Sequence, residues 1–271
     1  MEQEVQLNYQ EILSLLKESN KQFDSEIYIP SLNKEIHVKP MNAVHLKNII
    51  KTALSGTFID NQFNQAVYVI FKDVLDPSIP LSNITTLDKI LILLDLRKRN
   101  VKTTIGVEMS SENGSKVVDV DIGKLLTKYK KHKFKFEDVV VTDGSYSANT
   151  NFPSLDEEFI FDRDFEQSKI KKLDEKNKDS LKDIPGIMFM YYLAQFIKFI
   201  KIGEVSINLV ARPVQERISI TESLPSNLIN KIIEKIDSEF GQQINKILTI
   251  EQDIDGEKYT GLIEISPSLF S

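Results

Sequence analysis

The chain has 271 residues, of which 41% are hydrophobic and 27% are charged, a composition typical of a folded globular protein and not of a disordered one. Its formal net charge of −6 argues against a general nucleic-acid-binding protein, because such proteins normally have a basic balance. The absence of cysteine excludes disulfides, thiol catalysis and cysteine-ligated metal sites.

The N-terminal part predicts a helical arm followed by a β-hairpin. Apolar side chains recur at helical spacing in residues 9–17, which predicts a short helix. In residues 23–41, apolar and polar side chains alternate on both sides of the segment 30–34, which predicts two strands joined by a loop of several residues. The polar, acidic first residues lack the features of a signal peptide.

Three helices are predicted next. Asn42 is a suitable cap for a helix over residues 43–54, and a second helix is predicted over residues 62–75. Thr85 and Asp88 have the spacing of a capping box, which predicts that a third helix begins there. One face of this third helix is apolar, and it consists of Ile84, Leu87, Ile90, Leu91 and Leu94.

From residue 101 onwards the apolar spacing shifts toward two, which predicts antiparallel β-structure. Strands are predicted over residues 101–107 and 118–122, with Asn113 and Gly114 in the turn between them. A third strand is predicted within residues 134–141.

The lysine-rich run of residues 124–135 contains six lysines and no acidic residue. An exposed loop whose aromatic residues begin a strand is the first interpretation. A contact with an acidic protein partner is the second, and nucleic acid is the third. The candidate contacts are Lys128, Lys130, Lys131 and Lys133.

The C-terminal half begins with residues 161–183, in which basic and acidic residues alternate, as in a linker or an exposed helix start. Residues 187–202 are apolar and aromatic, which predicts a helix buried on more than one side, either in the core or against a partner. The lysines, proline and glycine around it make a membrane span a poor interpretation. A last helix is predicted over residues 224–236, followed by a hairpin that turns at Asp255-Gly256.

The predicted fold class is α+β, with an N-terminal β-hairpin and helices, central antiparallel β-segments, and C-terminal helices followed by a short β-segment. We expect four regions. They are an arm at 1–22, a hairpin-helix-β domain at 23–160, a charged linker at 161–183, and a helical region with a terminal β-hairpin at 184–271.

No residue pattern points to a reaction centre. His37 and His45 have no third residue at metal-ligand spacing, so structural roles are the simpler interpretation. Asp162 and Asp164 are a candidate carboxylate pair, although exposed acidic residues with this spacing are common. The sequence has neither a phosphate-binding glycine loop nor a nucleophile elbow. We therefore expect no enzyme, no cofactor and no metal.

Four blocks, in order, resemble the T4-type bacteriophage baseplate hub protein family. They are EIYIPSLNKEIHVKPM, ITTLDKILILLDLRKRNVKTTIGVEM, VVVTDGSYSANTNFPSL and the segment of residues 218–265. The matching residues are Pro30, Ser31, Lys34, Lys39, Pro40, Leu94, Leu96, Arg97, Phe152, Pro153, Ser154, Ile220, Glu222, Ser223 and Leu224.

The resemblance implies a structural or assembly protein of the baseplate hub of a contractile-tailed phage, which acts through protein–protein contacts. It would be found in the tail baseplate of the virion after assembly in the host cytoplasm. Its partners would be other hub or tail proteins, without membrane or specific nucleic acid, and an oligomer of the chain stays open. The candidate interface residues are Leu87, Ile90, Leu91, Leu94, Met188, Tyr191, Tyr192, Phe196 and Phe199.

Two alternatives stay open. One is a transient tail-assembly chaperone that the virion does not retain. The other is a nucleic-acid-associated regulator that uses the lysine-rich run of residues 124–135, whose binding would weaken steeply as the salt concentration rises.

Overall fold

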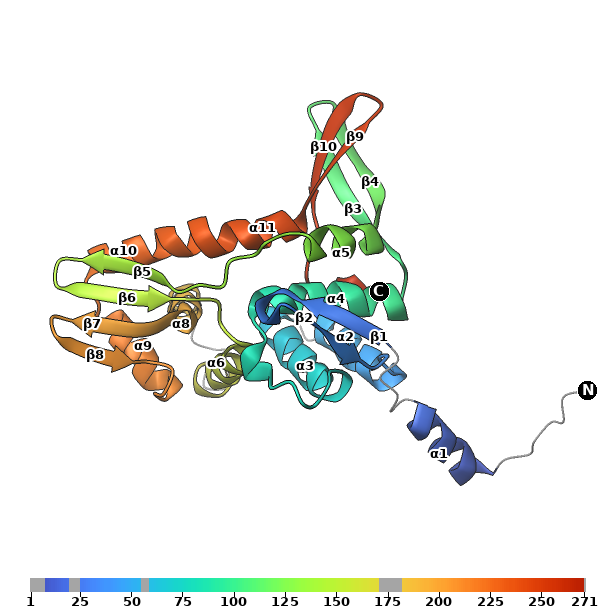
Figure 1. The fold of residues 1–271 in the computed structure, drawn as a ribbon, viewed down its shortest axis with the longest axis horizontal. Coiled ribbons are helices and arrows are strands. Elements are labelled where there is room, and N and C mark those ends of the chain that lie inside the picture. Colours follow the sequence, from blue (N-terminus) through green and yellow to red (C-terminus); the bar gives the residue numbers. More distant parts are fainter. Residues whose placement is uncertain (1–7, 20–24, 55–58, 171–181, 271) are drawn as a thin grey trace, which may run out of the picture.

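The computed structural model describes residues 8–19, 25–54, 59–170 and 182–270. Its three antiparallel sheets and many helices confirm the predicted α+β class. Figure 1 shows a central helical body, with one four-stranded sheet rising from it and a second four-stranded sheet at its side. A helical rod runs between the two sheets.

The N-terminal elements agree with the prediction. Helix α1 spans Tyr9–Ser19, and strands β1 (Ser25–Ile29) and β2 (Lys34–Val38) pair in an antiparallel hairpin. A single 3₁₀ turn, Pro30–Leu32, connects the strands and ends at Asn33, whose φ of 48° lies in the left-handed region that asparagine tolerates.

The central body consists of α2 (Ala43–Ala53), α3 (Ile59–Val74) and α4 (Thr86–Asn100). The predicted caps are confirmed. Asn42 accepts hydrogen bonds from the backbone of α2, and Thr85 and Asp88 form the reciprocal capping box of α4. Asp88 also accepts a 3.1 Å hydrogen bond from the backbone N–H of Ser31, so the cap of α4 holds the loop of the N-terminal hairpin as well.

The sheet that rises from the body joins two hairpins from distant parts of the sequence. Its strands are β3 (Thr104–Ser111), β4 (Gly114–Asp121), β9 (Thr249–Ile254) and β10 (Glu257–Leu262), in the order β4-β3-β10-β9. Both predicted hairpins are present, and the second turns at Asp255 and Gly256 as predicted. The first turns at Glu112 and Asn113, one residue before the predicted turn, because Gly114 already pairs with Ser111, and its first strand begins at Thr104 and not at residue 101. The second predicted strand ends earlier than expected, because Asp121 caps helix α5 (Ile122–Lys130).

The two hairpins meet at Gly261, which pairs with Met109. A Cβ atom on Gly261 would lie 2.6 Å from the carbonyl oxygen of Glu108 and 2.8 Å from the Met109 side chain. We therefore expect Gly261→Ala to lower the free energy of unfolding by about 1–3 kcal/mol, because β10 has to move away from β3. Urea unfolding measures this loss. Gly186→Ala is the matched control, since its new Cβ would meet nothing within 4 Å, and equal losses in the two variants would contradict the prediction.

The second sheet was only partly predicted. Its strands are β5 (Val139–Asp143), β6 (Tyr146–Thr150), β7 (Ile197–Ile202) and β8 (Val205–Asn208), paired in sequence order. The prediction of one helix over residues 187–202 was wrong at its C-terminal end. Helix α8 covers Ile184–Phe196, and the chain continues directly into β7. The largely apolar residues 187–202 show no clear period that separates helix from strand, and pairing with β6 makes residues 197–202 a strand.

The remaining helices also extend beyond the prediction. Helix α6 spans Leu155–Ser168 and thus includes the first part of the predicted charged linker, whereas residues 171–181 lie outside the described residues. Helix α9 (Val214–Glu222) was not predicted. The predicted last helix is α10 (Ser226–Lys235), which continues through the π-helical turn Ile236–Gly241 into α11 (Gln242–Leu248). This rod contacts β5 at one end and β9 at the other (Figure 1).

One hydrophobic core runs through most of the described chain, from Ile27 to Phe270. Helix α4 lies at its centre and is buried nearly all round from Leu87 to Arg97. A smaller cluster lies between α6, α8 and α9, and it contains Phe161, Phe165, Ile184, Tyr191, Ala194, Val214 and Ile218. The division into four regions stays a prediction.

Candidate functional site

The nine candidate interface residues fall into three groups in the structure. Leu87, Leu91 and Leu94 are buried inside the chain and have no surface for a partner. Phe199 lies on β7, where 38% of it is exposed. The other five, from α4 and α8, line one cleft, and they are Ile90, Met188, Tyr191, Tyr192 and Phe196.

This cleft has a volume of about 390 Å³ and lies where α3, α4, α6, α8 and α11 meet. Most of its wall is apolar. Phe161 and Phe165 of α6 pack edge-on against the ring of Tyr191, at centroid distances of 6.2 and 5.2 Å. Met188 and Tyr192 are 42% and 50% exposed, so they also present apolar surface to solvent. The cleft therefore has the mostly apolar lining that is usual for binding sites.

Hydrogen bonds hold the aromatic wall in place. The hydroxyl group of Tyr191 donates to Asp164 Oδ1 at 2.7 Å and accepts from Gln215 Nε2 at 2.7 Å. Burial and the bond to Asp164 raise the pKa of Tyr191. The phenol therefore stays protonated at neutral pH and keeps its donor role.

One end of the cleft is acidic. Glu158 forms an ion pair with Lys89, whose ammonium also donates to Asn64 at 3.0 Å. Asp162 Oδ1 accepts from Asn61 Nδ2 at 2.9 Å, whereas Asp162 Oδ2 is buried and has no hydrogen-bond partner in the part of the chain that the structure describes. Burial, together with the neighbouring charge of Glu158, raises the pKa of Asp162 to about 8.

The sequence analysis did not find this acidic end. It paired Asp162 with Asp164 as exposed carboxylates, but the structure separates the two side chains. Asp162 lines the cleft, whereas Asp164 accepts a hydrogen bond from Tyr191. The signal that was missed is the spacing of Phe161 and Phe165 by four residues, which predicts a buried helical face next to Asp162.

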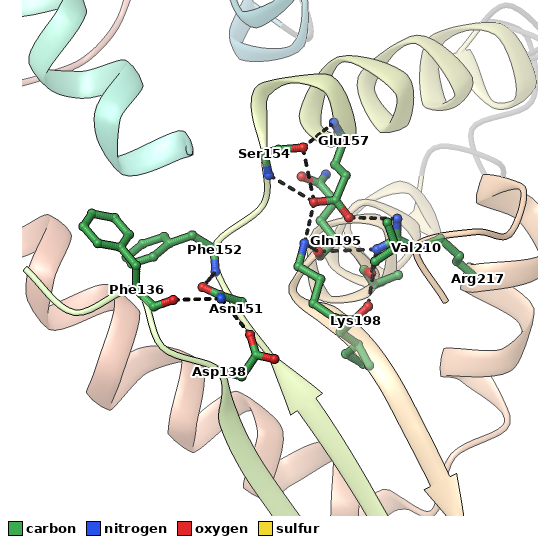
Figure 2. A network of polar contacts seen from close by, with 12 residues as sticks. Phe136, Asp138, Asn151, Phe152, Ser154, Glu157, Gln195, Lys198, Val210 and Arg217 are labelled. Carbon is green, nitrogen blue, oxygen red and sulfur yellow. Dashed lines mark hydrogen bonds and ion pairs between the residues drawn. The ribbon is translucent and has the colours of Figure 1, made fainter. Parts of the chain in front are cut away.

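A buried ionic network next to the cleft fixes α6 against β7 and α9 (Figure 2). Glu157 forms ion pairs with Lys198 and Arg217, and it also accepts a hydrogen bond from the backbone of Ser154. Burial alone would raise the pKa of Glu157, but the charge and hydrogen bond of Lys198 hold it below its ordinary value. Glu157 therefore stays ionised in the neutral range and connects α6, which lines the cleft, to β7 and α9.

The lysine-rich run is not the loop that was expected. Its first part is α5, and an irregular segment separates α5 from β5. Tyr129 is buried and donates a hydrogen bond to the carbonyl oxygen of Ile247. The four candidate lysines, Lys128, Lys130, Lys131 and Lys133, are exposed.

Lys128 and Lys131 lie with Lys246 around His132. Burial lowers the pKa of His132, and the charges of Lys246 and Lys128 lower it further. Lys130 forms an ion pair with Glu35 of the N-terminal hairpin. The lysines thus contribute a positive surface, remote in sequence from the cleft.

Of the two histidines in the N-terminal part, His45 has a structural role. His45 accepts from the backbone N–H of Asn42 in the cap of α2 and lies 3.0 Å from Asp73. Within the described ranges, no group of three or more histidine, cysteine or acidic residues could hold a metal ion. In the same ranges, no helix has the length and apolar character needed to cross a membrane.

The fold and the cleft define a class, an α+β protein with a partly apolar, partly acidic cleft. The model of the family described as T4 bacteriophage base plate protein matches residues 21–255, which is most of the chain. The chain belongs to this family. Searches of curated proteins and of solved structures found no match.

Membership confirms the resemblance at the level of a T4-type baseplate protein. It points to a structural protein of the phage tail baseplate, whose partners are other tail or baseplate proteins.

Proposed function

We propose that the protein is a subunit of the baseplate hub and that it binds a neighbouring hub or tail protein through the cleft and its exposed rim. The observation that carries this proposal is the exposure of Met188 and Tyr192 at a cleft whose lining is mostly apolar. Aromatic residues and methionine are enriched at protein interfaces, where they fill pockets of the partner. Assembly takes place in the host cytoplasm, before the protein becomes part of the completed virion.

The exposed lysines belong to the same proposal as a second contact. Lys128, Lys131 and Lys133 form a positive surface that suits an acidic region of a protein partner. A charged contact of this kind mainly speeds association and weakens as salt is added. The cleft, in contrast, supplies apolar area and so determines how long the complex lasts.

The test uses phage that carry Met188→Asp and Tyr192→Asp together. A charge at the rim, which the bound partner would have to bury, should lower incorporation of the protein into purified particles at least about tenfold, because hot-spot residues commonly contribute more than one factor of ten in affinity. Quantitative mass spectrometry of the particles gives the copy number. Val117→Asp is the control, because Val117 is 74% exposed on β4 and does not line the cleft.

The same experiment separates the proposal from its alternative. A fixed copy number in wild-type particles, lost in the double variant only, supports a hub subunit. Absence from wild-type particles, with co-purification of tail proteins from infected cells, would instead show a transient tail-assembly chaperone. Light scattering of the purified protein at increasing concentration determines whether the chain forms an oligomer.

A further inference from the structure

We infer that the acidic end of the cleft receives a lysine or arginine side chain, carried on an apolar segment of the partner protein. This inference rests on the proposed function, because it states what the partner presents to the cleft. It follows from an unpaired buried acceptor, from the balance of charge at that end, and from the composition of the walls.

The unpaired acceptor is Asp162 Oδ2. It is shielded from solvent, and none of the described residues donates a hydrogen bond to it, although Asn61 donates to the other oxygen of the same carboxylate. A buried carboxylate oxygen without a donor is unfavourable, and native proteins rarely leave one without a reason. A donor that arrives with the partner would remove this cost, and a charged donor would do so most effectively.

The charges of the residues that line the cleft favour a cation over an anion or a neutral group. Among the described residues, three acidic side chains line the cleft, Asp60, Glu158 and Asp162, against the single base Lys89. The ammonium of Lys89 already binds Glu158 and Asn64, so it does not neutralise Asp162 by direct contact. An anion would be repelled, and a neutral apolar group would leave Oδ2 unpaired. Burial and the neighbouring charge of Glu158 raise the pKa of Asp162 although the charge of Lys89 lowers it, and a bound cation would favour the ionised form of this carboxylate.

The apolar walls of the cleft favour a cation that is carried on an apolar chain of methylene groups. The rings of Phe161, Phe165 and Tyr191 line the same cleft as the acidic residues. Lysine and arginine bury their methylene groups along apolar surface while the charged head reaches a polar group, and a guanidinium also stacks on aromatic rings. A metal ion fits less well, because no sufficient group of ligands is present among the described residues.

The first test is a small probe that contains both parts of the expected group. Isothermal titration calorimetry compares 4-phenylbutylguanidine with 4-phenylbutylurea, which has nearly the same shape and no charge. We expect the guanidine to bind the wild-type protein at least about tenfold more tightly than the urea, because only the guanidinium offers a charge-assisted bond to Asp162. Equal affinities, or no binding of the guanidine, would overturn the inference without any variant.

The second test locates the cation. Asp162→Asn keeps the shape of the side chain and removes its charge, so the preference for the guanidine should disappear. Glu234→Gln makes the same change of charge on the exposed face of α10 and should leave the preference intact. A preference that persists in Asp162→Asn, with an unchanged melting temperature, would place the cation elsewhere and overturn the assignment.

Phage with Asp162→Asn distinguish a failure of this inference from a failure of the proposed function. If the rim double variant is lost from particles and Asp162→Asn is incorporated normally, the cation assignment fails and the interface stands. If both are incorporated at the wild-type copy number, the cleft is not the interface, and both proposals fail.

Discussion

Replacing Arg217 by methionine is expected to lower the free energy of unfolding by about 3–5 kcal/mol, because it leaves buried charges without their partner. The Arg217 side chain is 4% exposed. It donates to Glu157 Oε1 at 3.1 Å and to the carbonyl oxygen of Ala194 at 3.0 Å, and its guanidinium lies over the ring of Phe161. Methionine fills the space but supplies none of these donors, so Glu157 and the end of α8 lose their hydrogen bonds.

Urea unfolding of the purified protein measures this loss. Arg212→Met is the matched control, because Arg212 pairs with Glu216 at 3.0 Å on the surface and 45% of its side chain is exposed. Exposed pairs contribute about 0–1 kcal/mol, so the control should stay close to the wild type. Similar midpoints for the two variants would show that the network in Figure 2 does not fix α6 to its neighbours.

Leu94→Ala is expected to cost about 2–5 kcal/mol of stability in the isolated protein, whereas Met188→Ala should cost about 1 kcal/mol or less. Both residues come from the two helices that the sequence analysis favoured as interfaces. The structure separates them, because Leu94 is fully buried inside the chain and Met188 is 42% exposed at the rim of the cleft. Truncation of Leu94 leaves a cavity in the core, and truncation of Met188 removes surface that a partner would cover.

Thermal unfolding and particle incorporation, measured on both variants, give opposite patterns under this assignment. Leu94→Ala should lower the melting temperature, and any loss from particles should follow from the lower amount of folded protein. Met188→Ala should melt close to the wild type and still be incorporated less. A low melting temperature for Met188→Ala with normal stability of Leu94→Ala would reverse the assignment of core and interface.

About half of the candidate site could be predicted from the sequence. Five of the nine proposed interface residues do meet at the cleft, because aromatic and apolar residues in α8 mark a helix that has to be covered. The acidic end could not be predicted from the sequence, since Asp162 and Lys89 are 73 positions apart and only the packing of α4 against α6 brings them together. The burial of Asp162, which gives the carboxylate its properties, is likewise a consequence of packing.

The sequence by itself determined the elements whose causes are local. The caps at Asn42 and Thr85 and the turn at Asp255-Gly256 depend on a few neighbouring residues, and each was found where predicted. The other predicted turn is also local, and it lies one residue before its predicted position, at Glu112-Asn113. The order of four short blocks was also enough to indicate the baseplate family. Only the tertiary structure decided that residues 197–202 form a strand and that Gly261 joins two distant hairpins. Hydrogen bonds and packing between residues far apart in the sequence set these features, and no local pattern contains that information.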